Sequence, residues 1–237
     1  MADGSDPVGG RQGTMIRVMA SGSKALGATR VLLLRHAETS APACFHGAES
    51  DVGLGERGHR QAEAVARHLA NQRPGALYSS GMRRAIETAR PIARACGLQM
   101  QIVPDLYERR MGSLSGRPRD EGWAIYDEAR RRWISGDLDH THPGGESYAD
   151  IRRRVVPAFL QLAEQSPGQT AVVVAHGVVI RVLLTSLIEG FGPADFDRIA
   201  IEFVALNELQ SDDGRWRATS LDVRVESPLF TFVFPGI

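Results

Sequence analysis

The residues Val31–Leu34 form an unbroken run of four apolar side chains that stops at Arg35 and His36. A run without alternation is typical of a strand buried on both faces, as in a parallel sheet covered by helices. In such sheets ligands bind at the carboxyl ends of the strands, which is where Arg35 and His36 stand. A cation beside a potential nucleophile at this position indicates phosphate chemistry. The alternative is a strand that merely ends in two polar residues.

Strands and helices alternate along the rest of the chain. The expected strands cover residues 31–34, 76–78, 101–103, 170–175, 198–209 and 216–225, and the expected helices cover 56–71, 82–95, 121–134, 178–189 and a segment that opens at 147. This alternation predicts an α/β fold, a three-layer α/β/α sandwich with a mostly parallel central sheet and an inserted lid segment.

Local signals refine these elements. Ser79-Ser80 is expected to cap the helix that follows it, and Ser147-x-x-Asp150 has the form of a capping box. Pro91 should kink its helix or end it early, and Pro157 should bend its own helix. The charge run at residues 130–132 is expected to be a solvated face.

The chain is expected to form one domain over residues 29–237. Residues 1–28 are rich in Gly, Ser and Asp and are predicted to be a flexible N-terminal tail. Residues of about 105–145 are expected to leave the sheet as a lid excursion. The apolar segment 228–234 is expected to pack either on the core or on a second subunit, which leaves a homodimer open.

The composition excludes several classes of protein. The 28 basic and 28 acidic residues give a formal charge of zero, which argues against a nucleic-acid partner. No stretch approaches the roughly 20 apolar residues of a membrane span, and no secretory signal is recognisable. Cys44 and Cys96 lie far apart without CxxC spacing, which favours a cytoplasmic location. The pair His140-x-His142 resembles a loop rather than a ligand set, so neither metal nor cofactor is expected.

Further polar groups follow two other predicted strands. The strand 170–175 ends at His176-Gly177, and the strand 76–78 leads into a helix that carries Arg83 and Arg84. If the strands are parallel, their carboxyl ends share one edge of the sheet, and these groups converge with His36. A buried structural histidine is the alternative for His176.

At this point the sequence resembles the histidine phosphatase superfamily, also called the phosphoglycerate mutase-like family. Six blocks occur in the order of that family and span residues 30 to about 190. They are Leu34-Arg35-His36-Ala37-Glu38-Thr39, Gly47-x-x-x-Asp51-x-x-Leu54-x-x-x-Gly58-x-x-Gln61-Ala62, Ser79-Ser80-x-x-x-Arg84-Ala85-x-x-Thr88-Ala89, Leu106-x-Glu108-x-x-x-Gly112, Pro143-Gly144-Gly145-Glu146-Ser147 and Val174-Ala175-His176-Gly177.

The resemblance implies a role for each matching residue. His36 would be the nucleophile that forms a phosphohistidine, and Glu108 the acid that protonates the leaving oxygen. Arg35, Arg84 and His176 would hold the phosphoryl oxygens. Guanidinium forks neutralise the charge of a phosphoryl group without a metal, so this set is physically coherent.

The sequence departs from the family in two places. Ala37 follows the histidine where the family usually has glycine, and the phosphate-contacting Asn of many members is missing. Thr39 or Ser40 is expected to supply a hydroxyl in its place. Arg83 competes with Arg84, but the spacing to the following Ala and Thr-Ala residues favours Arg84.

The distance from Glu108 to His176, 68 residues by numbering, is shorter than in phosphoglycerate mutases and favours a phosphatase acting on a small phosphate ester. A mutase-type phosphotransferase and a non-catalytic phosphate-binding member are the alternatives. Gly177 is expected beside the phosphate. The candidates for contact with a second anionic group, each of which is otherwise an ordinary surface residue, are Arg109, Arg110, Arg117, Arg119, His140 and His142.

Overall fold

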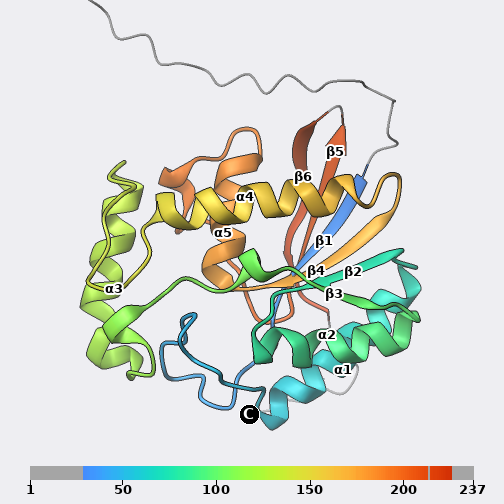
Figure 1. Cartoon of the computed structure of the whole chain (residues 1–237), viewed down its shortest axis with the longest axis horizontal. Coiled ribbons are helices and arrows are strands. Elements are labelled where there is room, and N and C mark those ends of the chain that lie inside the picture. Colours follow the sequence, from blue (N-terminus) through green and yellow to red (C-terminus); the bar gives the residue numbers. More distant parts are fainter. Residues whose placement is uncertain (1–28, 213, 226–237) are drawn as a thin grey trace, which may run out of the picture.

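The computed structural model describes residues 29–212 and 214–225, so the N-terminal tail and the segment 228–234 lie outside the described residues. The strands are β1 (Thr29–Arg35), β2 (Ala76–Ser79), β3 (Met100–Ile102), β4 (Thr170–Ala175), β5 (Leu206–Asp212) and β6 (Arg215–Val223). They form one sheet in the order β3-β2-β4-β1-β5-β6 (Figure 1). Strands β1 to β4 are parallel, and β5 and β6 are antiparallel.

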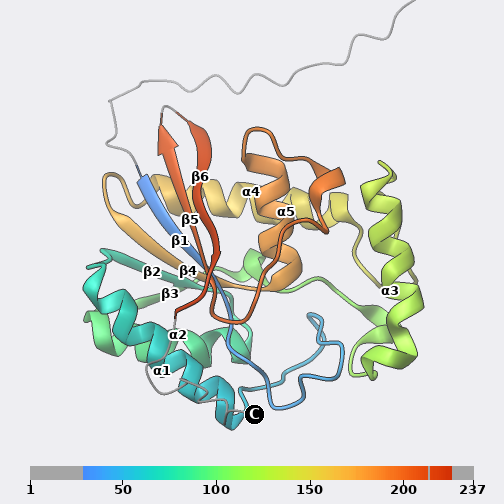
Figure 2. The ribbon, with the colours of Figure 1, turned by 180° about the vertical axis from the view of Figure 1, so that it is seen from behind.

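Helices cover both faces of this sheet. They are α1 (Glu56–Asn71), α2 (Arg83–Cys96), α3 (Arg119–Ile134), α4 (Tyr148–Glu164) and α5 (Gly177–Leu187). Helices α1 and α2 lie on one face and α4 and α5 on the other, whereas α3 stands beside the sheet (Figures 1 and 2). The expected α/β/α sandwich with a mostly parallel sheet is confirmed. None of the helices in the described residues is long and apolar enough to cross a membrane.

The apolar run of β1 is buried on both sides, as a central parallel strand should be. Leu32 and Leu34 pack with residues of α1 and α2, while Val31 and Leu33 pack with residues of α4 and α5. Because side chains alternate across a strand, an unbroken apolar run is what contact with two helical layers requires. The hydrophobic core therefore fixes the end of β1, and with it the position of the next residue, His36.

The expected strand over 198–209 is wrong in its first half, since β5 begins only at Leu206. The residues before it alternate like a strand because Ile199 and Ile201 are buried and their neighbours are not. Their carbonyl groups bond to arginine side chains instead of to a neighbouring strand, from Arg181 to Ile199 and from Arg35 to Ile201. Phe203 of this loop, residues 199–205, lines the cavity of the site described below.

Two other local expectations have different outcomes. The capping box is confirmed, because the Ser147 hydroxyl accepts from the Asp150 amide and Asp150 accepts from the Ser147 amide. The expectation that Pro91 ends its helix early is wrong, since α2 continues to Cys96. Helix α4 likewise continues past Pro157. Buried residues on both sides of each proline pack against the sheet and hold these helices together.

Helices α1 and α2 also hold the chain that follows His36. The Ala37 amide donates to the Thr88 hydroxyl at 3.0 Å, and the Glu38 amide donates to Gln61 at 2.9 Å. Gly58 lets α1 approach this chain, because a Cβ atom there would lie 2.0 Å from the Glu38 carbonyl oxygen. The close approach fixes the loop that carries Thr39.

We expect Gly58→Ala to destabilise the protein by about 1–3 kcal/mol, because the added methyl group forces the backbone of Glu38 to move. Helix propensity alone predicts the opposite sign, because alanine is favoured over glycine in a helix interior by about 1 kcal/mol. Urea unfolding measures the change. Arg67→Ala, at an exposed position of the same helix, should stay within about 0.5 kcal/mol of the wild type. A Gly58→Ala protein as stable as the wild type would contradict the steric argument.

Candidate active site

His36 lies at the carboxyl end of β1 and is 5% exposed. Its Nδ1 atom lies 2.8 Å from the Ala37 carbonyl oxygen, which can only accept a hydrogen bond. Burial, reinforced by the positive charges of Arg84 and Arg35, holds the pKa of His36 well below its usual range. A neutral imidazole that donates from Nδ1 keeps the lone pair of Nε2 free. An imidazole in this state has a free ring nitrogen beside the cavity.

His176 comes from the neighbouring strand, at the N-cap of α5, and its ring centroid lies 5.2 Å from that of His36. It is fully buried, and burial together with the charge of Arg84 lowers its pKa well below the usual value. Its Nε2 atom lies 2.8 Å from the Ser80 hydroxyl. The sequence predicted that Ser79-Ser80 caps α2, and this is wrong because the N-cap is Met82. Instead Ser80 orients His176.

Two arginines stand beside these histidines. Arg84 is 1% exposed and donates to the carbonyls of Ser50 and Gly47 at 3.1 and 3.3 Å, while its Nε atom has no partner among the described residues. Arg35 donates to the Ile201 carbonyl at 2.8 Å, and its Nε atom is likewise unpaired there. Burial lowers the pKa of Arg35 to about 10, so this group stays charged at neutral pH. Arg83, the competitor of Arg84, is exposed and pairs with Glu87.

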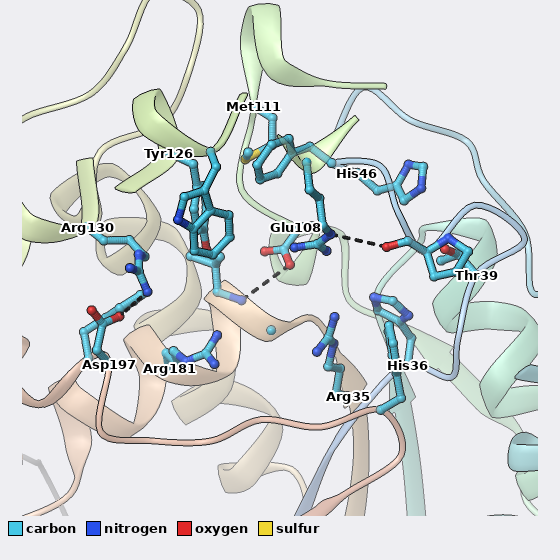
Figure 3. A pocket seen from close by; sticks show the side chains of 18 residues that line it. Arg35, His36, Thr39, His46, Glu108, Met111, Tyr126, Arg130, Arg181 and Asp197 are labelled. Atoms are coloured by element: carbon cyan, nitrogen blue, oxygen red, sulfur yellow. Dashed lines mark hydrogen bonds and ion pairs between the residues drawn. The ribbon is translucent and has the colours of Figure 1, made fainter. Parts of the chain in front are cut away.

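Glu108 lies across the cavity from His36 and is 8% exposed (Figure 3). Its two oxygens accept from the amide of Arg109 at 2.8 Å and from the amide of Val178 at 3.4 Å. The second amide belongs to the first turn of α5. Glu108 is therefore held between two segments that are distant in sequence.

A buried ion pair fixes the segment that carries Glu108. Glu146 and Arg154 are 2.8 Å apart, with both side chains 11% exposed. Arg154 donates to the carbonyls of Asp105 and Tyr107, and Glu146 accepts from the Arg110 amide. The backbone is thus held on both sides of Glu108. Glu146, from the Pro-Gly-Gly-Glu-Ser block, thus helps to position the segment that carries Glu108. The sequence motif alone did not predict this role.

The site contains a cavity of about 210 Å³. Five of the predicted site residues line it, namely Arg35, His36, Thr39, Glu108 and Gly177. Arg84 and His176 lie beside His36 but are not part of the cavity wall. The volume is below the roughly 300–1,000 Å³ typical of pockets for drug-sized ligands, which suits a small molecule. In the described part of the chain, no group of three or more His, Cys, Asp or Glu side chains could hold a metal ion.

The candidates for a second anionic group mostly lie elsewhere. Only Arg119 lines the cavity; Arg110, Arg117, His140 and His142 do not. Arg109 is fully buried on the other side of its segment, where it donates to the Glu146 carbonyl and lies 4.5 Å from the Trp133 ring. Because neighbouring residues of an extended segment point in opposite directions, Glu108 and Arg109 cannot both face the cavity.

Several residues that line the cavity were not predicted from the sequence. Arg130 was assigned to a solvated run, but it lies at the cavity between Asp127 and Asp197 (Figure 3). The position of Arg181 could have been predicted, because it follows Gly177 by one helical turn and therefore lies on the same side of α5. No short stretch of sequence predicts the aromatic side chains of the cavity wall, because they come from three distant segments. They are Phe45, Trp123, Tyr126, Phe196 and Phe203.

The comparison with known families decides what this site belongs to. A sequence model of the histidine phosphatase superfamily (branch 1) matches residues 31–224. The chain belongs to this superfamily. The metal-independent phosphoserine phosphatase of Arabidopsis thaliana is 36% identical to it over 186 residues, which make up 76% of this chain and 77% of that protein.

Two further proteins that resemble this histidine phosphatase are a mutase and a phosphatase. A probable phosphoglycerate mutase of Yersinia pestis is 33% identical over 192 residues, or 80% of this chain and 88% of that protein. The solved structure of a mycobacterial glucosyl-3-phosphoglycerate phosphatase has a TM-score of 0.73 at 27% identity and covers 83% of this chain and all of that one. The expectation of a phosphatase of this superfamily is confirmed at that level.

We expect the stability of this histidine phosphatase to fall as the pH drops below about 6.5, the usual histidine pKa. The pKa values of His36 and His176 are lowered in the folded protein, so below this pH the unfolded chain takes up protons that the folded one does not. Each histidine then contributes a loss of up to about 1.4 kcal/mol per pH unit. Urea unfolding between about pH 7.5 and pH 5 should show a smaller slope for His176→Asn and an unchanged slope for the exposed control His59→Asn. Equal slopes in all three proteins would contradict the assignment.

The Glu146–Arg154 pair generates a second prediction. Glu146→Leu should destabilise this histidine phosphatase by about 3–5 kcal/mol, because it leaves the buried Arg154 charge without its carboxylate. The double variant Glu146→Leu/Arg154→Leu should recover part of that loss in urea unfolding. In the exposed pair Glu63–Arg94 the corresponding single change should cost at most about 1 kcal/mol. Additive losses at Glu146 and Arg154 would show that the two charges do not depend on each other.

Proposed function

We propose that the protein hydrolyses small phosphate monoesters without a metal ion, through a phosphohistidine at Nε2 of His36. The hydrogen bond between Nδ1 and the Ala37 carbonyl carries this proposal, because it directs the free lone pair away from the backbone. The lowered pKa of His36 keeps that lone pair available at neutral pH. The 36% identity to a metal-independent phosphoserine phosphatase supports the same reading.

In the first step, Nε2 of His36 forms a bond to phosphorus as the bond between phosphorus and the ester oxygen breaks. Glu108, in its protonated form, gives its proton to the leaving oxygen, so the product departs as an alcohol. The electron pair of the broken bond stays on that oxygen. Glu108 lines the cavity together with His36, which is the placement this step requires.

In the second step, water attacks the phosphohistidine. Glu108, now a carboxylate, accepts a proton from the water as the new oxygen–phosphorus bond forms and the nitrogen–phosphorus bond breaks. The phosphate leaves, and His36 returns to the neutral imidazole. Water can reach the cavity because its rim is partly open, as the 45% exposure of Trp123 indicates.

The charge of the transferring group is neutralised by arginines. Arg35 and Arg84 each have an unpaired buried Nε atom, so each can donate to a phosphoryl oxygen without losing its bonds to backbone carbonyls. His176 has an unpaired Nδ1 atom in the same region. Groups fixed in advance around developing charge are the largest source of rate enhancement in phosphoryl transfer. Thr39 lines the cavity and supplies a hydroxyl where the family's Asn is missing.

The test measures phosphate release from phenyl phosphate in the presence of EDTA. Release should persist with the chelator and fall by at least about a thousandfold in His36→Ala, since the nucleophile is lost. His59→Ala, at an exposed position, serves as the matched control and should keep full activity. A requirement for added metal would contradict the mechanism.

Acid-labile labelling of the wild type by a radioactive phosphate ester, absent in His36→Ala, separates the phosphohistidine from direct attack by water. A mutase-type phosphotransferase would instead transfer this label to an added alcohol faster than to water. A non-catalytic phosphate-binding member would release no phosphate at all.

A further inference from the structure

Ser80 is a fully buried serine that the proposed reaction steps do not use. It follows β2 directly, where Ser79 pairs with Val174 of β4, and its amide donates to the Val174 carbonyl at 3.0 Å. The sheet therefore holds Ser80 beside His176, which follows β4 in the same way. The hydroxyl oxygen of Ser80 lies 2.8 Å from Nε2 of His176. A partner at one ring nitrogen fixes which of the two nitrogens carries the proton.

The position of this proton decides what His176 can do. His176 is neutral, because burial, reinforced by the charge of Arg84, holds its pKa well below the usual value. A neutral imidazole has a single N–H group, so one ring nitrogen donates and the other accepts. If Nε2 carries the proton, Nδ1 presents only a lone pair, which repels a phosphoryl oxygen. If Nδ1 carries the proton, it can donate a hydrogen bond to that oxygen.

The hydrogen bonds at Ser80 distinguish these two forms. The Met82 amide donates to the hydroxyl oxygen of Ser80 at 3.3 Å, so this oxygen already accepts one hydrogen bond. Within residues 29–212 and 214–225, Nε2 of His176 is the one acceptor that lies within reach of the hydroxyl proton. If Nε2 were protonated, that hydroxyl proton would be buried without an acceptor, which is costly.

The other form leaves a donor for a ligand. If Ser80 donates to Nε2, the hydroxyl group both accepts from Met82 and donates to His176, and its hydrogen bonds are complete. The proton of His176 is then on Nδ1, a buried atom without a partner among the described residues. An N–H group in this state is available to an incoming oxygen atom.

We propose that Ser80 is a positioning residue of this reaction, whose hydroxyl group donates to Nε2 of His176 and so places the proton of His176 on Nδ1, where it is donated to a phosphoryl oxygen. This inference rests on the proposed function, in which His176 holds the transferring group. Ser80 itself touches neither the substrate nor the reacting atoms. It acts only through the ring of His176.

The two histidines of the site thus receive the same protonation pattern by opposite means. The Ala37 carbonyl accepts from Nδ1 of His36, which leaves the Nε2 lone pair for phosphorus. The Ser80 hydroxyl donates to Nε2 of His176, which leaves the Nδ1–H group for the phosphoryl oxygens. Since the two ring centroids are 5.2 Å apart, a phosphoryl group on His36 is close to the donor.

Nitrogen NMR of isotope-labelled histidine tests the assignment on the wild-type protein at neutral pH. Long-range correlations from the ring nitrogens to the carbon-bound ring protons distinguish a protonated nitrogen from an unprotonated one, and His176→Asn identifies the signals of His176. Nε2 of His176 should be unprotonated and Nδ1 protonated. A protonated Nε2 would overturn the proposal, whether or not the protein hydrolyses phosphate esters.

Substitutions connect the proton to the reaction. Ser80→Ala removes the donor, so Nε2 should become protonated in part of the molecules and kcat/KM for phenyl phosphate should fall about tenfold. Ser80→Cys keeps the shape with a weaker donor and should give an intermediate value. A fall in kcat/KM without a change at Nε2 would show that Ser80 is merely structural, and an unchanged kcat/KM in Ser80→Ala would equally overturn the proposal.

Ser166 provides the matched control. It is also fully buried, and its hydroxyl group donates to the Leu162 carbonyl, but it lies near the amino end of β1, where Thr29 donates to its carbonyl. Ser166→Ala should therefore keep kcat/KM within about twofold of the wild type and leave the ring-nitrogen signals of His176 unchanged. The same changes in Ser166→Ala as in Ser80→Ala would overturn the specific role of Ser80.

Calorimetry with inorganic phosphate separates this inference from the proposed function. If the wild type releases no phosphate from phenyl phosphate, but binds inorganic phosphate about tenfold more tightly than Ser80→Ala does, the role of Ser80 stands and hydrolysis fails. If phosphate is released while Nε2 of His176 is protonated, hydrolysis stands and the role of Ser80 is overturned. If the protein neither hydrolyses the ester nor binds phosphate, both are overturned.

Discussion

Burial of two guanidinium groups next to an imidazole is the constraint on which the rest of this site depends. Burial lowers the pKa of both Arg84 and Arg35 at this edge of the sheet. Burial of His36 itself, reinforced by these two charges, holds the pKa of His36 well below its usual range. A buried charge is tolerated only when backbone or side-chain groups satisfy it. Arg84 donates hydrogen bonds to backbone carbonyls of the loop after His36, and Arg35 donates to the Ile201 carbonyl. The conformations of these two loops therefore depend on hydrogen bonds from the arginines as well as on the sequences of the loops.

The part of the site that was predictable from the sequence is the part attached to the sheet. The apolar runs before His36 and His176 identify parallel strands, and parallel strands bring their carboxyl ends together. The next strand and the start of its helix place Arg83 and Arg84 at the same edge, and the spacing of the family motif selects Arg84. In these places one short stretch of sequence determines the local structure, and the sheet determines the rest.

The other part depends on contacts that no short stretch contains. Residues 199–205 alternate like a strand, but Arg181 and Arg35 take their carbonyls, so the strand begins later than its pattern indicates. Arg109 was expected at the substrate, yet it faces Trp133, because the direction of Glu108 was fixed by the amide of Val178, 70 residues further along. Helix α3 contributes to the cavity only through its orientation beside the sheet.

The bond from Arg35 to the Ile201 carbonyl has a thermodynamic consequence. This guanidinium group already gives one nitrogen to the protein and lies 4.0 Å from the Phe203 ring, so its rotamer is set before any ligand arrives. Its Nε atom is left over for an anion. The conformational entropy of a long side chain is thus lost during folding rather than during binding, and an incoming anion meets a group that need not be ordered again.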